Sequence, residues 1–253
     1  MPEDASRVAD RTVLVTGAAS GIGRAIAQAL VDAGANVLAV DLEPAPDGPG
    51  EPFAADLLTR EGNRDAVRAA VDAFGGLDTI VANAGFQHVA PIVEFDEDRW
   101  DALLGILLTS PFLLARYGWE HLAESGHGRF VAIASAHALA ASPFKVGYVS
   151  AKHGVLGLVK TLALEGAEHG LTATAVCPGF VRTPLVEKQI PGQAKAHGME
   201  EDEVLEKVIL APHVLKRLIE PEEVAQAVLF LLGPGGSAFT GAPLIMDAGW
   251  TAR

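Results

Sequence analysis

The chain has 253 residues, of which 49% are hydrophobic and 20% charged, and its formal net charge is −13. This composition supports a substantial core and excludes an extensively disordered chain. The acidic balance argues against nucleic acid or an anionic membrane surface as a partner. The one cysteine, Cys177, permits no internal disulfide bond and fits a cytoplasmic protein. We interpret it as a buried small residue rather than a nucleophile.

Three further features of the sequence argue against other classes. Residues 1–10 are polar and lack the apolar core of a signal peptide. No apolar run reaches about 18 residues, so we expect no membrane span. The histidines are scattered, without a cysteine cluster, so we expect no metal site.

Short apolar strands alternate with helices along the chain. Strands are expected over residues 11–16, 36–40, 51–54, 77–82, 129–134, 171–176 and 243–246. Helices are expected over residues 24–33, 59–74, 96–124, from 148 to about 170, and over 221–232. This alternation predicts an α/β fold with a doubly wound parallel sheet, and we expect residues 1–253 to form one domain. Residues 183–215 interrupt the rhythm and are expected to form a helical lid over the substrate.

A glycine-rich turn follows the first predicted strand. Gly17-Ala-Ala-Ser-Gly21-Ile-Gly23 leads into a helix, and the next strand ends at Asp41. Such a turn alone is often only a tight bend, but this strand, helix, strand and acid are the context of a dinucleotide site. The carboxylate of Asp41 would bind ribose hydroxyls and repel a 2′-phosphate, and no arginine follows within residues 42–50. The sequence therefore predicts NAD rather than NADP.

Tyr148 and Lys152 stand four residues apart at the start of a predicted helix, so their side chains share a face. A phenol has a pKa of about 10, and a neighbouring ammonium favours the phenolate. We therefore expect Lys152 to lower the pKa of Tyr148 and the pair to act as an acid or base. Alone this spacing is a weak signal. However, Asp41, Asn83, Ser135 and Pro178-Gly179 are all predicted at the carboxyl ends of strands, where ligands bind in such sheets.

Together these motifs resemble the classical short-chain dehydrogenase/reductase family. The resemblance rests on Thr16 to Gly23, Asn83-Ala84-Gly85, Ser135, Tyr148-x-x-x-Lys152 and Pro178-Gly179, and it spans nearly the whole chain. It implies a Rossmann-type fold and hydride transfer between a nicotinamide cofactor and an alcohol or ketone carbon. It also implies that Tyr148 is the acid/base, that Lys152 assists it and holds the ribose, and that Ser135 binds the substrate oxygen. The implied cofactor contacts are Gly17, Ser20, Gly21, Ile22, Gly23, Asp41, Asp56, Leu57, Asn83, Tyr148, Lys152, Pro178 and Val181.

A narrower resemblance, to the D-3-hydroxybutyrate dehydrogenases of this family, rests on residues 85–92, 135–137, 142–145, 183–190 and 247–252. It implies an enzyme that interconverts (R)-3-hydroxybutyrate and acetoacetate. The substrate contacts it implies are Gln87, His137, Lys145, Gln189 and Trp250. An acidic protein that binds an acid substrate needs a fixed cation in the site, and Lys145 would supply it. Taken singly, Lys145 and Gln189 could instead be surface residues, and His137 could be a helix cap. The family resemblance also implies a homotetramer.

One position departs from the family. Leu107 stands where the family carries an asparagine that holds a water linked to the lysine. We expect the helix over residues 96–124 to run regularly past Leu107 and proton release to be slowed. A milder change occurs at residues 247–249, which are Asp-Ala-Gly where the family favours Asp-Gly-Gly. Two alternatives stay open: a dehydrogenase for another hydroxy acid or alcohol, and a non-catalytic NAD-binding scaffold, which only Leu107 favours.

Overall fold

The computed structural model describes residues 8–252 and contains a seven-stranded parallel sheet of order β3-β2-β1-β4-β5-β6-β7. The strands are β1 (Thr12–Thr16), β2 (Asn36–Asp41), β3 (Glu51–Ala54), β4 (Thr79–Ala82), β5 (Arg129–Ile133), β6 (Thr172–Pro178) and β7 (Pro243–Met246). The predicted α/β fold is therefore confirmed. The strand order reverses between β1 and β4, and in such sheets the ligand crevice opens at the carboxyl ends next to this reversal.

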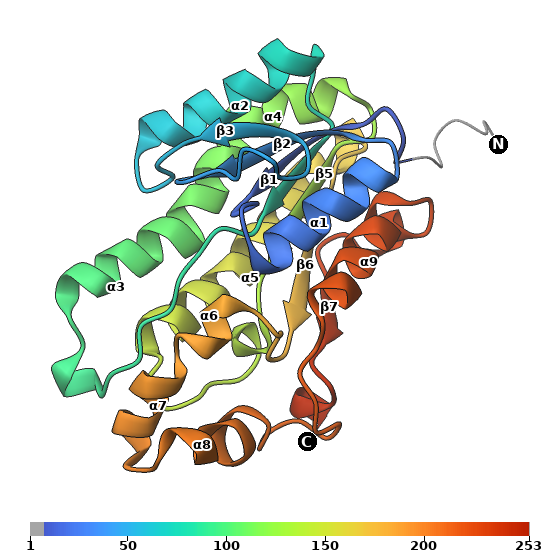
Figure 1. The fold of residues 1–253 in the computed structure, drawn as a ribbon. Coiled ribbons are helices and arrows are strands. Elements are labelled where there is room, and N and C mark those ends of the chain that lie inside the picture. The colour runs from blue at the N-terminus through green and yellow to red at the C-terminus, as the bar shows by residue number, and fades with distance from the viewer. Residues whose placement is uncertain (1–7, 253) are drawn as a thin grey trace.

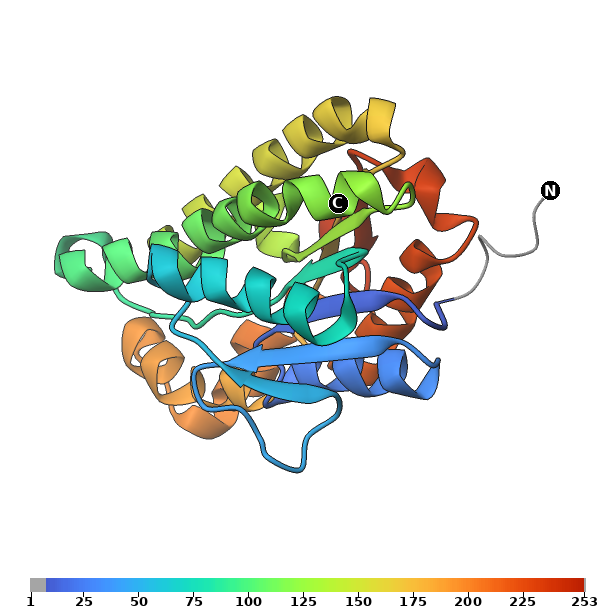
Figure 2. The same ribbon diagram turned by 90° about the horizontal axis from the view of Figure 1, so that it is seen from above.

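Helices cover both faces of the sheet (Figures 1 and 2). On one face α1 (Gly21–Asp32) and α9 (Pro221–Leu232) pack against Val13, Val15 and Val81. On the other face α2 (Arg60–Phe74), α4 (Ser110–Glu124) and α5 (Val146–Gly166) pack against Leu14 and Ile80. Successive strand residues point to opposite faces, so both sets of side chains must be apolar. This explains the continuous hydrophobic runs of the strands.

The helix predicted over residues 96–124 is interrupted. α3 (Glu97–Leu104) runs into a π-helical turn at Gly105–Thr109, and α4 follows. The expectation of a regular helix past Leu107 is therefore wrong. Pro111 explains the break, because it has no N–H to donate to the carbonyl of Leu107 four residues earlier, and its ring would clash with that carbonyl in an α-helix. The interruption thus needs no polar side chain at residue 107.

The segment Glu97–Glu124 is long and apolar enough to cross a membrane by length and composition alone. In the fold, however, this segment serves as a core helix. Leu114, Ala115 and Leu122 of α4 are buried in the cluster that includes the sheet and α2.

Residues 183–215 fold beside the carboxyl edge of the sheet. They contain α6 (Pro184–Glu187), α7 (Ile190–His197), α8 (Glu201–Val204) and a π-helical turn at Leu205–Ile209. Figure 1 shows these short helices gathered below the sheet, next to the first turns of α5. They have a small core of their own, in which Val186, Val204 and Ile209 pack with Phe180.

Candidate active site

A cavity opens where β1, β2 and β4 end. The predicted residues that line it are Gly17, Ser20, Gly21, Ile22, Asp41, Asp56, Leu57 and Asn83. Gly17 has a φ of +67°, and a Cβ there would lie 2.8 Å from Nδ2 of Asn83, so this position requires glycine. The helix α1 begins at Gly21, earlier than predicted, so its N-terminus opens onto the cavity. Such a helix end favours a pyrophosphate.

Side chains around the turn hold its shape. Oδ2 of Asp41 accepts a hydrogen bond from the Ala19 amide at 3.0 Å, and Nδ2 of Asn83 donates to the Thr16 carbonyl at 2.9 Å. Among the described residues that line this cavity there is no lysine or arginine. Gly23, also predicted as a cofactor contact, is not among the residues that line this cavity. A Cβ at Gly23 would collide with the carbonyl oxygen of Gly17, so this glycine keeps the turn compact.

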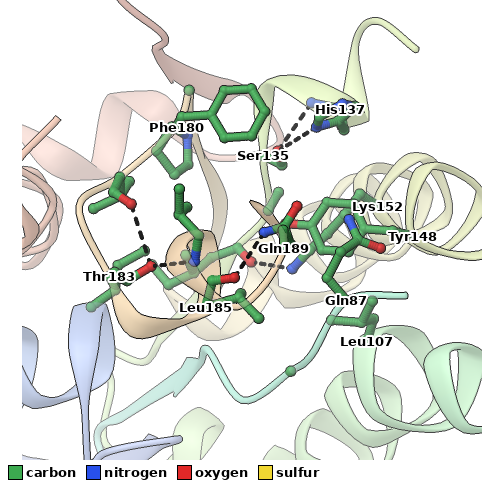
Figure 3. Close-up of a pocket in the computed structure, with 18 of the residues that line it drawn as sticks. Gln87, Leu107, Ser135, His137, Tyr148, Lys152, Phe180, Thr183, Leu185 and Gln189 are labelled. Carbon is green, nitrogen blue, oxygen red and sulfur yellow. Dashed lines mark hydrogen bonds between the residues drawn. The ribbon is translucent and has the colours of Figure 1, made fainter. Parts of the chain in front are cut away.

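An adjoining cavity brings the other predicted residues together (Figure 3). Its lining includes Ser135, Tyr148, Lys152, Gln87, His137, Lys145, Gln189, Trp250, Pro178 and Val181. Both cavities share Ile22, Asn83, Gly85, Thr183 and Leu185. A dinucleotide held by the glycine turn could therefore reach the groups around Tyr148, and the residues present fit a nicotinamide cofactor.

Tyr148 and Lys152 lie on one face of α5, as predicted. Nζ of Lys152 is 5.5 Å from the centre of the Tyr148 ring and donates to the Ile133 carbonyl at 2.6 Å. Burial raises the pKa of Tyr148 to about 12, against the opposing effect of its hydrogen bond with Ser135. Burial also lowers the pKa of Lys152 to about 8. The prediction of a lowered Tyr148 pKa is therefore wrong, because desolvation disfavours the phenolate more than the hydrogen bond with Ser135 favours it.

Leu107 forms an apolar part of the wall of this cavity. It is 2% exposed and packs with Leu103 and Ala151. Its Cδ2 fills the space in which a Cβ on Gly85 would lie. A leucine offers no hydrogen bond, and Lys152 instead uses the backbone carbonyl of Ile133.

Lys145 is a buried cation. It is 2% exposed, its Nζ donates to Oε1 of Gln189 at 3.1 Å, and it lies 4.7 Å from the centre of the Phe180 ring. Among the described residues no carboxylate forms an ion pair with it. Burial lowers the pKa of Lys145 to about 7. An ammonium without a counter-charge is costly in such surroundings, so an anion in this cavity would be stabilised.

His137 lies between Ser135 and Trp250. Its Nδ1 is 3.4 Å from Oγ of Ser135, and its ring packs edge-on against Trp250 at 4.8 Å between ring centres. The helix cap at this point is Ser135 and not His137, because the His137 amide donates to Oγ of Ser135 at 3.1 Å. Burial first, and then the charge of Lys145, lower the pKa of His137 to about 3.

The sequence did not identify Phe180 as part of the site. Its ring stacks on Trp250 at 5.6 Å between centres and contacts Lys145. Its one signal was its position directly after Pro178-Gly179, at the carboxyl end of β6. Cys177, one position before this proline, is fully buried as predicted, and burial raises its pKa to about 11.

Comparison with known proteins identifies the family. Residues 17–251 match the family model described as enoyl-(acyl carrier protein) reductase. A D-beta-hydroxybutyrate dehydrogenase of Rhizobium meliloti (strain 1021) is 42% identical, with 96% of this chain and 99% of that protein covered. The chain belongs to the short-chain dehydrogenase/reductase family. This family member is therefore an oxidoreductase that binds a nicotinamide cofactor.

Two other similar proteins support the assignment. A D-beta-hydroxybutyrate dehydrogenase of Cupriavidus necator is 39% identical to this short-chain dehydrogenase, with 96% of this chain and 98% of that protein covered. The ligand-free structure of Thermoplasma acidophilum aldohexose dehydrogenase has a TM-score of 0.89 and 28% identity, and covers 97% of this chain and 96% of its own. The substrates in the names of these proteins differ, so family membership alone does not identify the substrate.

Proposed function

We propose that this protein is an NAD-dependent dehydrogenase that interconverts (R)-3-hydroxybutyrate and acetoacetate, or acts on a closely related 3-hydroxy acid. The observation that carries the proposal is Lys145, a buried cation that lines the same cavity as Ser135 and Tyr148 and has no carboxylate partner among the described residues. A substrate carboxylate would supply that partner. The names of two similar proteins agree with this reading.

The same cavity suggests how the reaction proceeds. In the oxidation direction Tyr148, as the phenolate, takes the proton of the substrate hydroxyl on its own oxygen. Ser135 donates a hydrogen bond to the reacting oxygen, and Lys152 stabilises the negative charge on Tyr148. When bound, the nicotinamide supplies the acceptor for the hydride that leaves C3. The carbon and oxygen of the substrate are left as a ketone, and one proton remains on Tyr148.

The glycine turn, Asp41 and Asn83 would hold the cofactor. NAD is the proposed form, since a carboxylate at the end of β2 accepts ribose hydroxyls and no cation beside it could bind a 2′-phosphate.

The experiment is a steady-state assay of NADH formation with a panel of hydroxy acids and a neutral secondary alcohol. Lys145→Ala should raise KM for 3-hydroxybutyrate about 10- to 150-fold, since a hydrogen bond to a charged group contributes about 1.5–3 kcal/mol. The alcohol should be far less affected. Lys160→Ala is a matched control, because Lys160 is an exposed lysine of the same helix, α5.

Two results would contradict the proposal. An unchanged KM in Lys145→Ala would show that this residue does not bind the carboxylate, and would favour a dehydrogenase for a different substrate. A parent protein that turns over none of the hydroxy acids would exclude the proposed activity altogether.

A further inference from the structure

Ser142 is linked to the site by a hydrogen bond to His137. Its Oγ is 3.0 Å from Nε2 of His137, and on the other side of the ring Nδ1 faces Oγ of Ser135 at 3.4 Å (Figure 3 shows the contacts of His137 with Ser135). Ser142 does not line the cavity that contains Tyr148. It lines a neighbouring cavity, whose wall shares Lys145, Phe180 and Trp250 with the cavity of Tyr148. The imidazole therefore connects Ser142 to Ser135 by two hydrogen bonds.

The imidazole of His137 is neutral at physiological pH, because burial and the nearby Lys145 and His153 hold its pKa near 3. A neutral imidazole carries one proton, so one ring nitrogen donates and the other accepts. The hydrogen bonds that link Ser142, His137 and Ser135 therefore run in opposite directions in the two tautomers.

The direction decides what Ser135 can do. In the Nε2–H tautomer the ring donates to Ser142, and Nδ1 draws the one hydroxyl proton of Ser135 away from Tyr148. In the Nδ1–H tautomer the ring donates to Oγ of Ser135, which already accepts from the His137 amide at 3.1 Å. Both lone pairs of that oxygen are then occupied, so its proton can only be donated toward Tyr148 and the reacting oxygen.

We propose that Ser142 is a positioning residue that donates to Nε2, holds His137 as the Nδ1–H tautomer, and so makes Ser135 an obligatory hydrogen-bond donor. The hydrogen bond at Nε2 is the shorter of the two at the ring, and Ser135 also bonds to Tyr148. A donor fixed before the reaction stabilises the developing charge without reorganisation. The kinetic part of this inference rests on the proposed function, and the tautomer does not.

The tautomer is tested by ¹⁵N NMR of the labelled protein without substrate, with the His137 signals assigned by comparison with His137→Gln. We expect Nδ1–H in the parent, a shift toward Nε2–H in Ser142→Ala, and the parent tautomer in Ser142→Thr, which keeps the hydroxyl. In the assay, Ser142→Ala should lower kcat about 2- to 10-fold, the effect of one neutral hydrogen bond. KM should stay unchanged and Ser142→Thr should restore kcat. Ser150→Ala, at an exposed serine of α5, is the control that should alter neither tautomer nor rate.

An Nε2–H tautomer in the parent would overturn the proposal, as would a tautomer that Ser142→Ala leaves unmoved. An unchanged kcat in that variant would also overturn it, and so would a raised KM with no change of tautomer. If the parent turns over no hydroxy acid, the proposed function fails, and the NMR result alone decides whether Ser142 fixes the tautomer.

Discussion

The charge of Lys145 should control how the enzyme responds to pH. Because burial holds its pKa at about 7, the ammonium form is lost as the pH rises through 7. An anionic substrate requires that form, so KM for 3-hydroxybutyrate should be constant below about pH 7 and rise up to tenfold per unit above it. The measurement is KM between about pH 6 and pH 9 at saturating NAD.

Lys145→Arg is the matched control, because a guanidinium stays protonated throughout this range. Its KM should not rise with pH. His137 stays neutral over the same range, and Lys152, with a pKa of about 8, should affect kcat rather than KM. The same rise of KM in Lys145→Arg would show that another group titrates.

Asp41 should determine the choice of cofactor. We expect kcat/KM to be much higher with NAD than with NADP, because the carboxylate repels a 2′-phosphate. Asp41→Ala combined with Leu42→Arg removes the repulsion and adds a cation, because Leu42 lines the same cavity as Asp41. The double variant should therefore reduce the difference in kcat/KM between NAD and NADP. Comparable kcat/KM values for both cofactors in the parent would contradict this prediction.

At the scale of the elements, the strand ends were predictable and the surroundings of the lysines were not. Asp41, Asn83 and Ser135 could be placed from sequence because a strand that ends in a polar residue is a local pattern, and parallel strands end at one edge. The burial of Lys145 depends on α6 and α7 folding over α5, which brings Gln189 to it from 44 positions away. No local pattern reports such a contact.

The π-helical turn has a local cause in the sequence. The apolar side chain at residue 107 predicts a regular helix, whereas Pro111 interrupts the hydrogen bonds of the backbone. The prediction for the pKa of Tyr148 was wrong for a different reason. The sequence gives the spacing of Lys152 but does not give the burial of the phenol, and burial is what raises this pKa.

Leu107→Asn tests what the turn contributes to the reaction. The turn is already π-helical there, so an asparagine would add a polar group beside the cavity without a change of helix type. If proton release is impaired in the parent, kcat should rise and the affinity for NAD should change little. Stability should fall by about 1–3 kcal/mol, because part of the amide is buried without a partner. Measuring kcat and Tm on this one variant separates the effect on proton release from the effect on stability. A lower kcat would reject the hypothesis that Leu107 impairs proton release.

At the scale of the whole molecule, the net charge of −13 opposes the approach of an anionic substrate, while Lys145 attracts it only at short range. Salt should separate these effects. The Debye length falls from about 30 Å at 0.01 M to about 10 Å at 0.1 M, so the distant repulsion is screened, whereas a buried cation is screened much less. Over this range kcat/KM for 3-hydroxybutyrate should rise at saturating NAD, because steering by the whole protein acts on association. A neutral secondary alcohol should show no such rise. If kcat/KM for the acid falls steadily instead, the field at the mouth of the cavity is positive in spite of the net charge, and the cations around that mouth must outweigh the acidic surface.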